Sequence, residues 1–550
     1  MAQYFVFKST NIFTGTQKGF LNGYVVFQGQ RITGVYSVNE LPKLIEQQAT
    51  LIDYHDNTIV PGFIEAHAHV QMSALIVNDM IQTIAGESEE ECISQLRKQI
   101  PKAKFINGWL VAKGWYLPHW KTQQMPTKSS LDAYFKSYPV MLISDDLHTI
   151  WVNSIGLAAL EELLVIRPDD VIKIKNEPSG VVKEKTAMAC MNHVLTLSIQ
   201  QRARIYSSYL KHLAAKGYTS VCDLALLPAE DTADCDDQIY PEVYQKLEER
   251  NQLPVRVFLF PFFDPAAQRV KKLRQQVASP LISVAGGKQF FDGVISSQTA
   301  WLKENYENAD HAGKPTIEPM LLKQMIDLAQ KEQIPLRVHS IGDQATSLAI
   351  RYFLEAHKKH GPLTTGYHSL EHLERIQKQD IGAMKKADLI ASVQPSHPLL
   401  DYQKVCKDIG ERSKYMWPLK DISIQGIPLA FGSDSPVVQE VGPLDNLYYA
   451  MTRQTKEEKP KGGWQPEQQL DLYDALFAHT RGASKACGSQ ERIGTLEAGK
   501  QADLVVVEGN LSNSSTNKIH QLSILATIVN GQITYKKEEG KHYVKGASNF

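Results

Sequence analysis

Two histidines separated by one residue are the clearest chemical signal in the chain. His67 and His69 lie in the segment PGFIEAHAH, which spans residues 61–69. Because residues two apart in an extended strand point to the same side, the two imidazoles can bind one metal ion. A bare His-x-His pair also fits two buried histidines that only satisfy hydrogen bonds. Its position at the end of an expected strand favours the metal site.

Three further side chains lie at the ends of other apolar segments. His339 ends the segment PLRVH, His372 follows YHSLE, and Asp434 ends LAFGSD. Each of them alone is equally well explained by a hydrogen bond to a neighbouring carbonyl or, for Asp434, by capping of the next helix. Catalytic groups of barrel enzymes lie at the carboxyl ends of different strands. The joint placement of these side chains therefore predicts a single metal-binding cluster.

The central part of the chain alternates short apolar segments with segments of helical periodicity, such as Pro319–Lys331 and Gln344–Lys359. This alternation predicts a parallel sheet wrapped by helices. Eight strands suit a (β/α)8 barrel better than an open, doubly wound sheet. The eight expected strands are Ile59–Ala66, Thr219–Asp223, Val255–Phe260, Lys288–Asp292, Pro335–His339, Thr365–Leu370, Leu389–Gln394 and Pro428–Gly432.

The interval between the first two expected strands is far longer than an ordinary connection between a strand and a helix. We expect a long insertion at about residues 85–215 that covers the mouth of the barrel. Binding residues are often found on such connecting segments. The insertion is therefore expected to help form a substrate pocket.

Both ends of the chain have the sequence pattern of short antiparallel strands separated by turns. Asn530-Gly531 lies between two apolar segments and is a strong hairpin signal. We expect residues 1–60 and 485–550 to form one composite β-sandwich domain beside a central domain of residues 61–484. The expected strands are Tyr4–Phe7, Tyr24–Gln28, Arg31–Tyr36, Thr58–Val60, Ala502–Glu508, Ile524–Val529 and Gln532–Lys536.

The bulk composition argues against several classes of function. The 550 residues include 59 Lys and Arg against 60 Asp and Glu, so no net field attracts nucleic acid or an anionic membrane. The sequence contains neither a P-loop nor a Rossmann glycine fingerprint. We expect a small-molecule partner, no nucleic acid and no membrane, and we leave a homo-oligomer open.

The expected compartment is the cytoplasm. The N-terminal segment MAQYFVFKST lacks the basic and apolar regions of a secretory signal. No segment reaches the ~20 apolar residues of a spanning helix. The six cysteines are scattered singly, which is typical of reduced thiols rather than of a disulfide framework.

Six segments together carry a resemblance to a known family: PGFIEAHAH, GGKQFFDG, RVHSIGDQA, SLEHLERI, SVQPSH and FGSDSPV. In this order they resemble the amidohydrolase superfamily and, more narrowly, its amidohydrolase-3 group, which includes N-substituted formamide deformylases. The segments WLVAKGW, HTIWVNS and GTLEAGKQAD fit the same group, so the resemblance spans nearly the whole chain. It implies an α/β fold with a distorted TIM (β/α)8 barrel and a β-sandwich built from both termini.

The resemblance also implies a site for one or two divalent ions, with zinc as the expected metal. Carried over by position, His67 and His69 bind the first ion together with Asp434. His339 and His372 bind the second ion.

Lys288, in the segment KQFFDG, matches a lysine that relatives use as a carboxylated bridge between two metals. An ammonium group cannot ligate a cation, whereas a carbamate formed with CO2 is anionic and has two oxygens. The alternative is an ammonium that pairs with Asp292 or lies in solvent. That alternative would favour a centre with one metal.

Six other positions match the group less specifically and are expected to contact substrate or to hold ligands in place. For each of them, ordinary packing or capping is the alternative. These positions are Trp115, His148, Ser297, Glu371, Gln394 and His397.

The chain departs from the group in two places. Glu65 stands where an aspartate is commoner, two residues before His67. Residues 294–297 read VISS, where relatives often have SLGS. The second departure is the one expected to alter the pocket.

The resemblance implies hydrolysis of a non-peptide carbon–nitrogen bond in a small amide-like molecule, such as an N-acyl or N-formyl compound. We expect the metal centre to lower the pKa of a bound water to about 7. Asp434 would then accept the proton of that water and deliver it to the departing amine.

Other functions remain possible. The same chemistry attacks esters, lactones and cyclic amides. A deaminase of this fold typically carries a glutamate three residues after the fifth-strand histidine, where this chain has Gly342. A non-catalytic scaffold relative usually loses ligands, whereas every expected ligand is present here.

Overall fold

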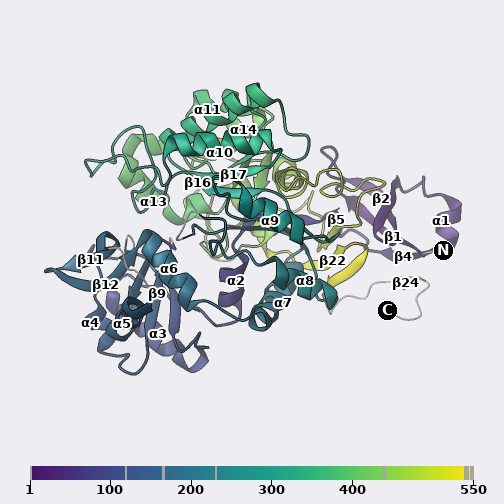
Figure 1. The fold of residues 1–550 in the computed structure, drawn as a ribbon. Helices are drawn as coiled ribbons and strands as arrows, with labels where there is room; N and C mark the ends of the chain where they lie inside the picture. The colour runs from purple at the N-terminus through teal and green to yellow at the C-terminus, as the bar shows by residue number, and fades with distance from the viewer. Residues whose placement is uncertain are drawn as a thin grey trace.

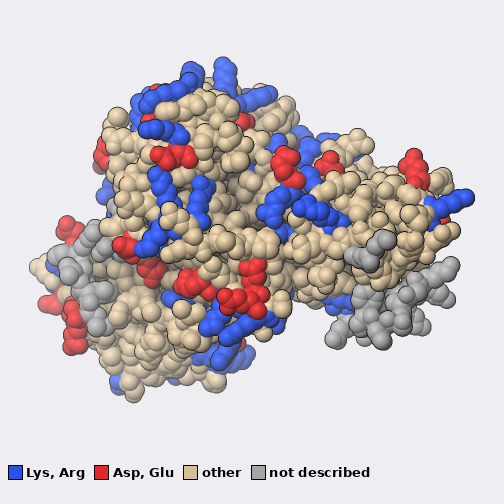
Figure 2. All heavy atoms as spheres, turned by 45° about the vertical axis from the view of Figure 1, so that its right-hand side comes forward, with Lys and Arg blue, Asp and Glu red and all other residues tan. Residues whose placement is uncertain are grey.

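The strands of the chain form four sheets (Figure 1). The computed structural model describes residues 3–117, 120–145, 147–163, 168–228, 232–437, 441–537 and 544–545. Within this part of the chain, no helix is both long enough and apolar enough to cross a membrane. On the face drawn in Figure 2, Lys and Arg side chains lie among Asp and Glu side chains and do not form one continuous area.

Two parallel sheets form the centre of the molecule. In the four-stranded sheet the order is β15 (Ile282–Val284), β14 (Arg256–Phe260), β13 (Tyr218–Leu224) and β6 (Phe63–Ala68). In the five-stranded sheet the order is β16 (Gly287–Phe290), β17 (Leu336–Ser340), β18 (Ser369–His372), β19 (Ile390–Val393) and β20 (Leu429–Phe431). All eight expected central strands are present, and β15 is additional.

No continuous ladder joins these two sheets among the described residues, but isolated bridges link them at two seams. At the first seam, between β6 and β20, Ala68 pairs with Ser435. At the second seam, between β14 and β16, Phe262 pairs with Lys288. Each seam therefore lies beside residues that the sequence marks as metal ligands.

Helices connect and cover the central strands. Helix α10 (Pro319–Lys331) shows how they form, because Pro319 occupies its first turn and the Glu318 side chain accepts a hydrogen bond from Leu321 N at 2.9 Å. Its buried residues recur at helical spacing and face the strands. The other helices here are α2 (Val70–Val77), α8 (Pro241–Glu249), α9 (Gln268–Gln276), α11 (Asp343–His360), α12 (Ile381–Lys386), α13 (His397–Ile409), α14 (Leu419–Ile424), α15 (Pro443–Thr452), α16 (Leu472–Phe477) and α17 (Ala483–Ala486).

The first expected strand is wrong in one respect, because Ile59–Ala66 is divided between two sheets. Strand β5 (Thr58–Pro61) belongs to the sheet of the chain ends, whereas β6 begins at Phe63. The break falls at Gly62, whose backbone N–H donates to the carbonyl of Asp503 at 3.0 Å. Residue 62 is thus the point at which the chain leaves one sheet for the other.

The two chain ends form one nine-stranded sheet, in which β21 pairs antiparallel with β5. The expected hairpin is present, with φ of 52° at Asn530 and 70° at Gly531. Strand β4 was not among the expected strands, and residues 538–543 and 546–550 lie outside the described residues. The strands are β1 (Tyr4–Ile12), β2 (Leu21–Gln28), β3 (Arg31–Ser37), β4 (Ala49–Asp53), β5, β21 (Leu504–Val507), β22 (Ile524–Val529), β23 (Gln532–Lys536) and β24 (Val544–Lys545), with helix α1 (Lys43–Gln48) before β4.

The segment between β6 and β13 contains a six-stranded sheet of its own, which lies apart from the sheet of the chain ends (Figure 1). Its strand order is β11 (Val171–Ile174), β12 (Glu177–Lys183), β10 (Thr149–Val152), β9 (Val140–Ser144), β8 (Leu110–Trp115) and β7 (Gln82–Thr83). The helices of this segment are α3 (Glu89–Gln99), α4 (Lys128–Asp132), α5 (Ser154–Leu163), α6 (Glu184–Val194) and α7 (Ile199–Ala215). We call this segment the insertion.

Candidate metal centre

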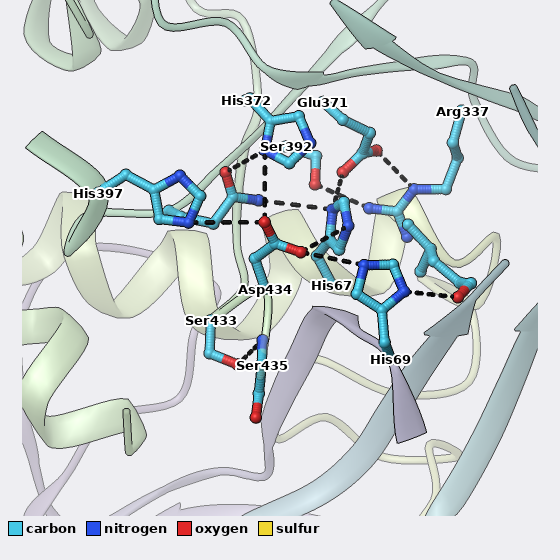
Figure 3. Close-up of polar contacts among 12 residues, drawn as sticks. His67, His69, Arg337, Glu371, His372, Ser392, His397, Ser433, Asp434 and Ser435 are labelled. Atoms are coloured by element: carbon cyan, nitrogen blue, oxygen red, sulfur yellow. Dashed lines mark hydrogen bonds and ion pairs between the residues drawn. The ribbon is translucent and has the colours of Figure 1, made fainter. Parts of the chain in front are cut away.

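Three buried side chains meet at the first seam (Figure 3). His67 and His69 lie at the end of β6, and Asp434 follows β20. Asp434 Oδ1 lies 3.3 Å from His67 Nε2 and 3.1 Å from His69 Nε2. Residues more than 360 positions apart in the sequence thus come together, as predicted from the strand ends.

The hydrogen bonds of the two histidines indicate where their protons lie. His67 Nδ1 is 2.6 Å from Glu371 Oε2, and His69 Nδ1 is 2.9 Å from the carbonyl oxygen of Leu224. Both oxygens accept hydrogen bonds, so each Nδ1 carries the proton and each Nε2 presents a lone pair. These two lone pairs face the Asp434 carboxylate, which is also an acceptor.

Hydrogen-bond acceptors that face one another without a hydrogen-bond donor between them need a positive charge at their centre. Two ligand atoms that each lie about 2.1 Å from a tetrahedral zinc ion are about 3.4 Å apart. This spacing is close to the distances from Asp434 Oδ1 to the Nε2 atoms of His67 and His69. Among the described residues, Asp434 Oδ1 has no hydrogen-bond donor. The residues present therefore fit a divalent cation.

His372 and His339 extend this cluster. One ligand atom from each of His67, His372 and Asp434 lies within 4.8 Å of the other two. The ring centroids of His339 and His372 are 4.5 Å apart. His372 Nδ1 is 2.9 Å from Gln394 Oε1, and His339 Nε2 is 3.2 Å from the carbonyl oxygen of Gly293. Each ring is thus held through one nitrogen and retains the other as a possible ligand.

Lys288 lies fully buried on β16 beside these rings. Among the described residues, none accepts a hydrogen bond from its Nζ, which lies 4.8 Å from the centroid of the Phe290 ring. Burial lowers the pKa of this amine to about 8. The expected alternative, an ammonium paired with Asp292, is not found, because the Asp292 carboxylate accepts from the backbone N–H groups of Trp301, Ile341 and Gly342.

The charge states in the centre are those that ligation requires. Burial lowers the pKa of His67 to about 4 and that of His339 to about 3, so both imidazoles are neutral at pH 7. Burial opposes ionisation of the Asp434 carboxyl, and positive charge on the neighbouring imidazoles would hold its pKa well below its usual range. Because these imidazoles are neutral at pH 7, a bound cation would have to supply that charge.

The buried ion pair between Glu371 and Arg337 orients the His67 ring through its Nδ1 atom. Glu371 Oε1 accepts from Arg337 Nε at 2.7 Å, and Arg337 Nη2 donates to Ser392 Oγ at 2.7 Å. Burial opposes the charge on Glu371, yet Arg337 and His67 hold the pKa of its carboxyl well below 4.5. Glu371 and Gln394 therefore hold ligand rings in place.

A cavity of about 650 Å³ opens onto the centre. We call its two sides the strand-end wall and the insertion wall. The strand-end wall includes His67, His69, Lys288, His339, His372 and Asp434. The insertion wall includes Ile84, Lys113, Tyr116, Asp145, Leu147, His148 and Met188.

The other expected pocket residues fall into two groups. His148 and His397 line the cavity, and His397 Nε2 lies 3.6 Å from Asp434 Oδ2.

Trp115 does not line the cavity, because its indole packs in the core of the insertion and donates to the carbonyl of Leu142 at 2.9 Å. Ser297 is exposed and its hydroxyl contacts Thr299. Trp115 and Ser297 thus do not line this cavity, whereas their neighbours Tyr116 and Ser296 do.

His148 is fixed by its neighbours at the end of the ladder between β10 and β12. Its Nδ1 lies 3.4 Å from Glu184 Oε2, and its carbonyl accepts from Glu184 N at 2.8 Å. Leu147 and Glu184 have φ of 60° and 53°, a region that non-glycine residues rarely adopt. The structure thus orients this imidazole at the cavity wall.

Several residues of the site were not found from the sequence. Lys113 and Asp145 form an ion pair at the cavity, and Arg337 lies behind the ligands. In WLVAKGW and PLRVH, a basic residue interrupts an apolar strand, and burial of a cation usually requires a specific partner. This interruption could have identified Lys113 and Arg337 from the sequence. For Glu374, which lines the cavity beside His397, we find no comparable signal in the sequence.

Comparison with known proteins decides the family. The model of the amidohydrolase family matches residues 50–535. The chain is a member of the amidohydrolase family. It is accordingly a hydrolase, and the family resemblance inferred from the motifs is confirmed.

Two relatives match this amidohydrolase over nearly its whole length. The YtcJ protein of Bacillus subtilis (strain 168) is 27% identical, with 96% of this chain and 98% of YtcJ covered. The N-substituted formamide deformylase of Arthrobacter pascens is 22% identical, with 93% of this chain and 95% of the relative covered. A metal-dependent hydrolase from Pyrococcus horikoshii OT3 shares the fold, with a TM-score of 0.73 at 21% identity over 94% of this chain and 99% of that one.

Proposed function

We propose that this amidohydrolase cleaves a non-peptide carbon–nitrogen bond in a small amide-like molecule, such as an N-acyl or N-formyl compound. One observation carries the proposal: the lone pairs of His67 and His69 converge on the Asp434 carboxylate in a cavity large enough for a drug-sized molecule. We propose zinc as the metal, because histidine nitrogens and a carboxylate oxygen are its usual ligands in catalytic sites.

When bound, a divalent cation would lower the pKa of a coordinated water and polarise the scissile carbonyl oxygen. His67, His69 and Asp434 would hold the first ion, and His339 and His372 a second. Asp434 accepts the proton of the attacking water and delivers it to the nitrogen of the departing amine.

We also propose that Lys288 becomes carboxylated, which would give it two anionic oxygens able to ligate the ions. A neutral lysine amine adds to CO2, so that one N–C bond forms and one proton is released. The lowered pKa of Lys288, about 8, supports this step because it increases the neutral fraction of the amine. Lys288 lies on β16 at the second seam and lines the same cavity as His67 and His69, which supports this role.

The cavity walls support a substrate with apolar substituents. Away from the ligands, the lining is mainly aliphatic and aromatic, with Ile84, Leu147 and Met188 from the insertion and Ile295 and Trp417 from the opposite side. A small molecule of this kind is the proposed partner, and a homo-oligomer stays open.

We infer further that the two parallel sheets are the two parts of one distorted (β/α)8 barrel. Two backbone hydrogen bonds at each seam support this: Asp434 N to His67 O and His69 N to Ser435 O at the first, Lys288 N to Pro261 O and Phe263 N to Lys288 O at the second. Residues 61–484 would form this domain, with the insertion at about 85–215. Residues 1–60 and 485–550 would form the composite β-sandwich.

Metal analysis of the purified protein, followed by a substrate panel, tests the proposed function. We expect one or two equivalents of zinc and hydrolysis of N-acyl or N-formyl compounds. Matched esters, lactones and cyclic amides in the same panel measure the preference for the bond, and release of ammonia would reveal a deaminase. Protein without stoichiometric metal, or metal-loaded protein that cleaves no amide in the panel, would overturn the proposal.

A further inference from the structure

At the first seam, the strands that carry His67, His69 and Asp434 are not joined by a regular ladder. In the described residues, Ala68 and Ser435 form the one pairing between them, as an isolated bridge. In a continuous parallel sheet, carbonyl groups of the neighbouring strand would accept from the backbone N–H groups of β6 and of the segment after β20. Two backbone bonds do cross this seam, from Asp434 N to the carbonyl of His67 and from His69 N to the carbonyl of Ser435. The buried N–H groups of His67 and Ser433 require another acceptor.

The Glu65 side chain supplies that acceptor. Its Oε1 accepts from the backbone N–H of His67 at 2.9 Å and from the backbone N–H of Ser433 at 2.8 Å. Glu65 is 1% exposed, so water does not compete for these bonds. One carboxylate oxygen thus joins the backbone of a ligand to the residue directly before another ligand.

Asp434 needs such support because its backbone is strained. Its φ is 58°, in the left-handed region that non-glycine residues rarely adopt. Residues in such conformations persist where their surroundings hold them firmly. Here Ser433 N is held by Glu65, and Asp434 N donates to the carbonyl of His67 at 2.8 Å.

The close approach of the two strands beside Glu65 depends on a glycine. A Cβ atom added at Gly432 would lie 2.6 Å from His67 N and 2.9 Å from Glu65 Oε1. Glycine at this position therefore allows the segment after β20 to lie against His67 and against the Glu65 carboxylate that joins the two strands.

We infer that Glu65 is a positioning residue that fixes the distance between the first and the last strand of the metal centre, and so holds Asp434 against His67 and His69. This inference rests on the proposed function in requiring a bound cation. It assigns a role to the position at which this chain departs from the aspartate that is commoner in its group.

The test measures zinc affinity directly, by competition with a chromophoric chelator, for Glu65→Ala, Glu65→Gln and the wild type. We expect Glu65→Ala to bind zinc about 10–100-fold more weakly, as is usual when a residue that orients ligands is lost. Glu65→Gln retains a carbonyl oxygen that can accept both N–H groups, so its affinity should stay within about threefold of the wild type. In cobalt-substituted protein, the visible absorption band should change in Glu65→Ala and not in Glu65→Gln.

Asp503→Ala is the matched control for loss of stability. Asp503 is another buried carboxylate, which accepts from Asn530 N at 2.7 Å and pairs with Arg256 away from the centre. This variant should unfold at a lower temperature and keep its zinc affinity. The inference is overturned if Glu65→Ala binds zinc like the wild type, if Glu65→Gln loses as much affinity as Glu65→Ala, or if Asp503→Ala loses as much. A wild type that binds no divalent cation would instead overturn the proposed function itself.

Discussion

The two walls of the cavity are built on different principles. On the strand-end wall, the imidazoles of His67, His69 and His372 each have a hydrogen-bond partner that sets the orientation of the ring. On the insertion wall, Ile84, Leu147 and Met188 present apolar surface, and the directional contacts there are those of His148 with Glu184 and of Lys113 with Asp145. Directional contacts fix the position of reacting atoms, whereas apolar surface accommodates many shapes of similar volume. Under the proposed function, catalysis and specificity would therefore belong to separate parts of the chain, and the comparison can be tested wall by wall.

Removal of the metal should have the largest effect. Dialysis against a strong chelator should abolish hydrolysis and lower the unfolding temperature, because a ligand that binds only the folded state stabilises it. Activity assays and thermal unfolding before and after addition of zinc measure both effects. Full turnover in metal-free protein would contradict the role of the strand-end wall.

Asp434→Asn should be the most damaging single substitution of the strand-end wall. The amide cannot accept the proton of the attacking water, so kcat should fall by about 10²–10⁴-fold. Determining the metal content alongside kcat separates loss of the proton acceptor from loss of the ion. A variant that retains its metal and its turnover would refute the role of Asp434.

Glu371→Gln should have a smaller effect. The amide can still contact His67, but the buried Arg337 loses its ionic partner at 2.7 Å and the orientation of the ring weakens. We expect about 10–100-fold weaker metal binding, measured by chelator competition, together with lower stability. Unchanged metal affinity would show that the ion pair only supports the fold.

Substitutions of the insertion wall should leave kcat nearly intact. Met188→Ala removes apolar contact worth about 1–2 kcal/mol, and His148→Ala removes an oriented imidazole, so each should raise KM by roughly 5–30-fold. His193→Ala, an exposed change on the same helix α6, is the control. If kcat of Met188→Ala or His148→Ala fell as much as that of Asp434→Asn, the expected difference in role between the two walls would be contradicted.

The strand-end wall was largely predictable from the sequence because its geometry follows from topology. Parallel strands end at one edge, so His339, His372 and Asp434 at strand ends had to lie near the His-x-His pair. Local periodicity also located each central strand to within a few residues. It did not reveal that the chain passes from β5 to β6 at Gly62, because both strands are apolar and the bond from Gly62 N to Asp503 O is a long-range contact.

The insertion wall was not predictable in the same way. Its presence followed from the length of the interval, but the side chains that face the cavity depend on the register of a separate sheet. Trp115 and Tyr116 are adjacent, and a shift of one residue in a strand reverses which side chain faces which side. The role of Glu65 was also hidden, because it arises from the packing of two strands far apart in sequence.

The pairing of β5 with β21 has a consequence for synthesis of the protein. Thr58 pairs with Val507. Strand β5 is therefore synthesised early in translation, whereas β21, which pairs with its edge, is synthesised near the end. At the usual 5–20 residues per second, roughly 20–90 s pass between them. During that time the nascent chain carries an exposed strand edge, which is prone to pair with other chains. Chaperone demand should therefore be greatest before the last fifty residues leave the ribosome.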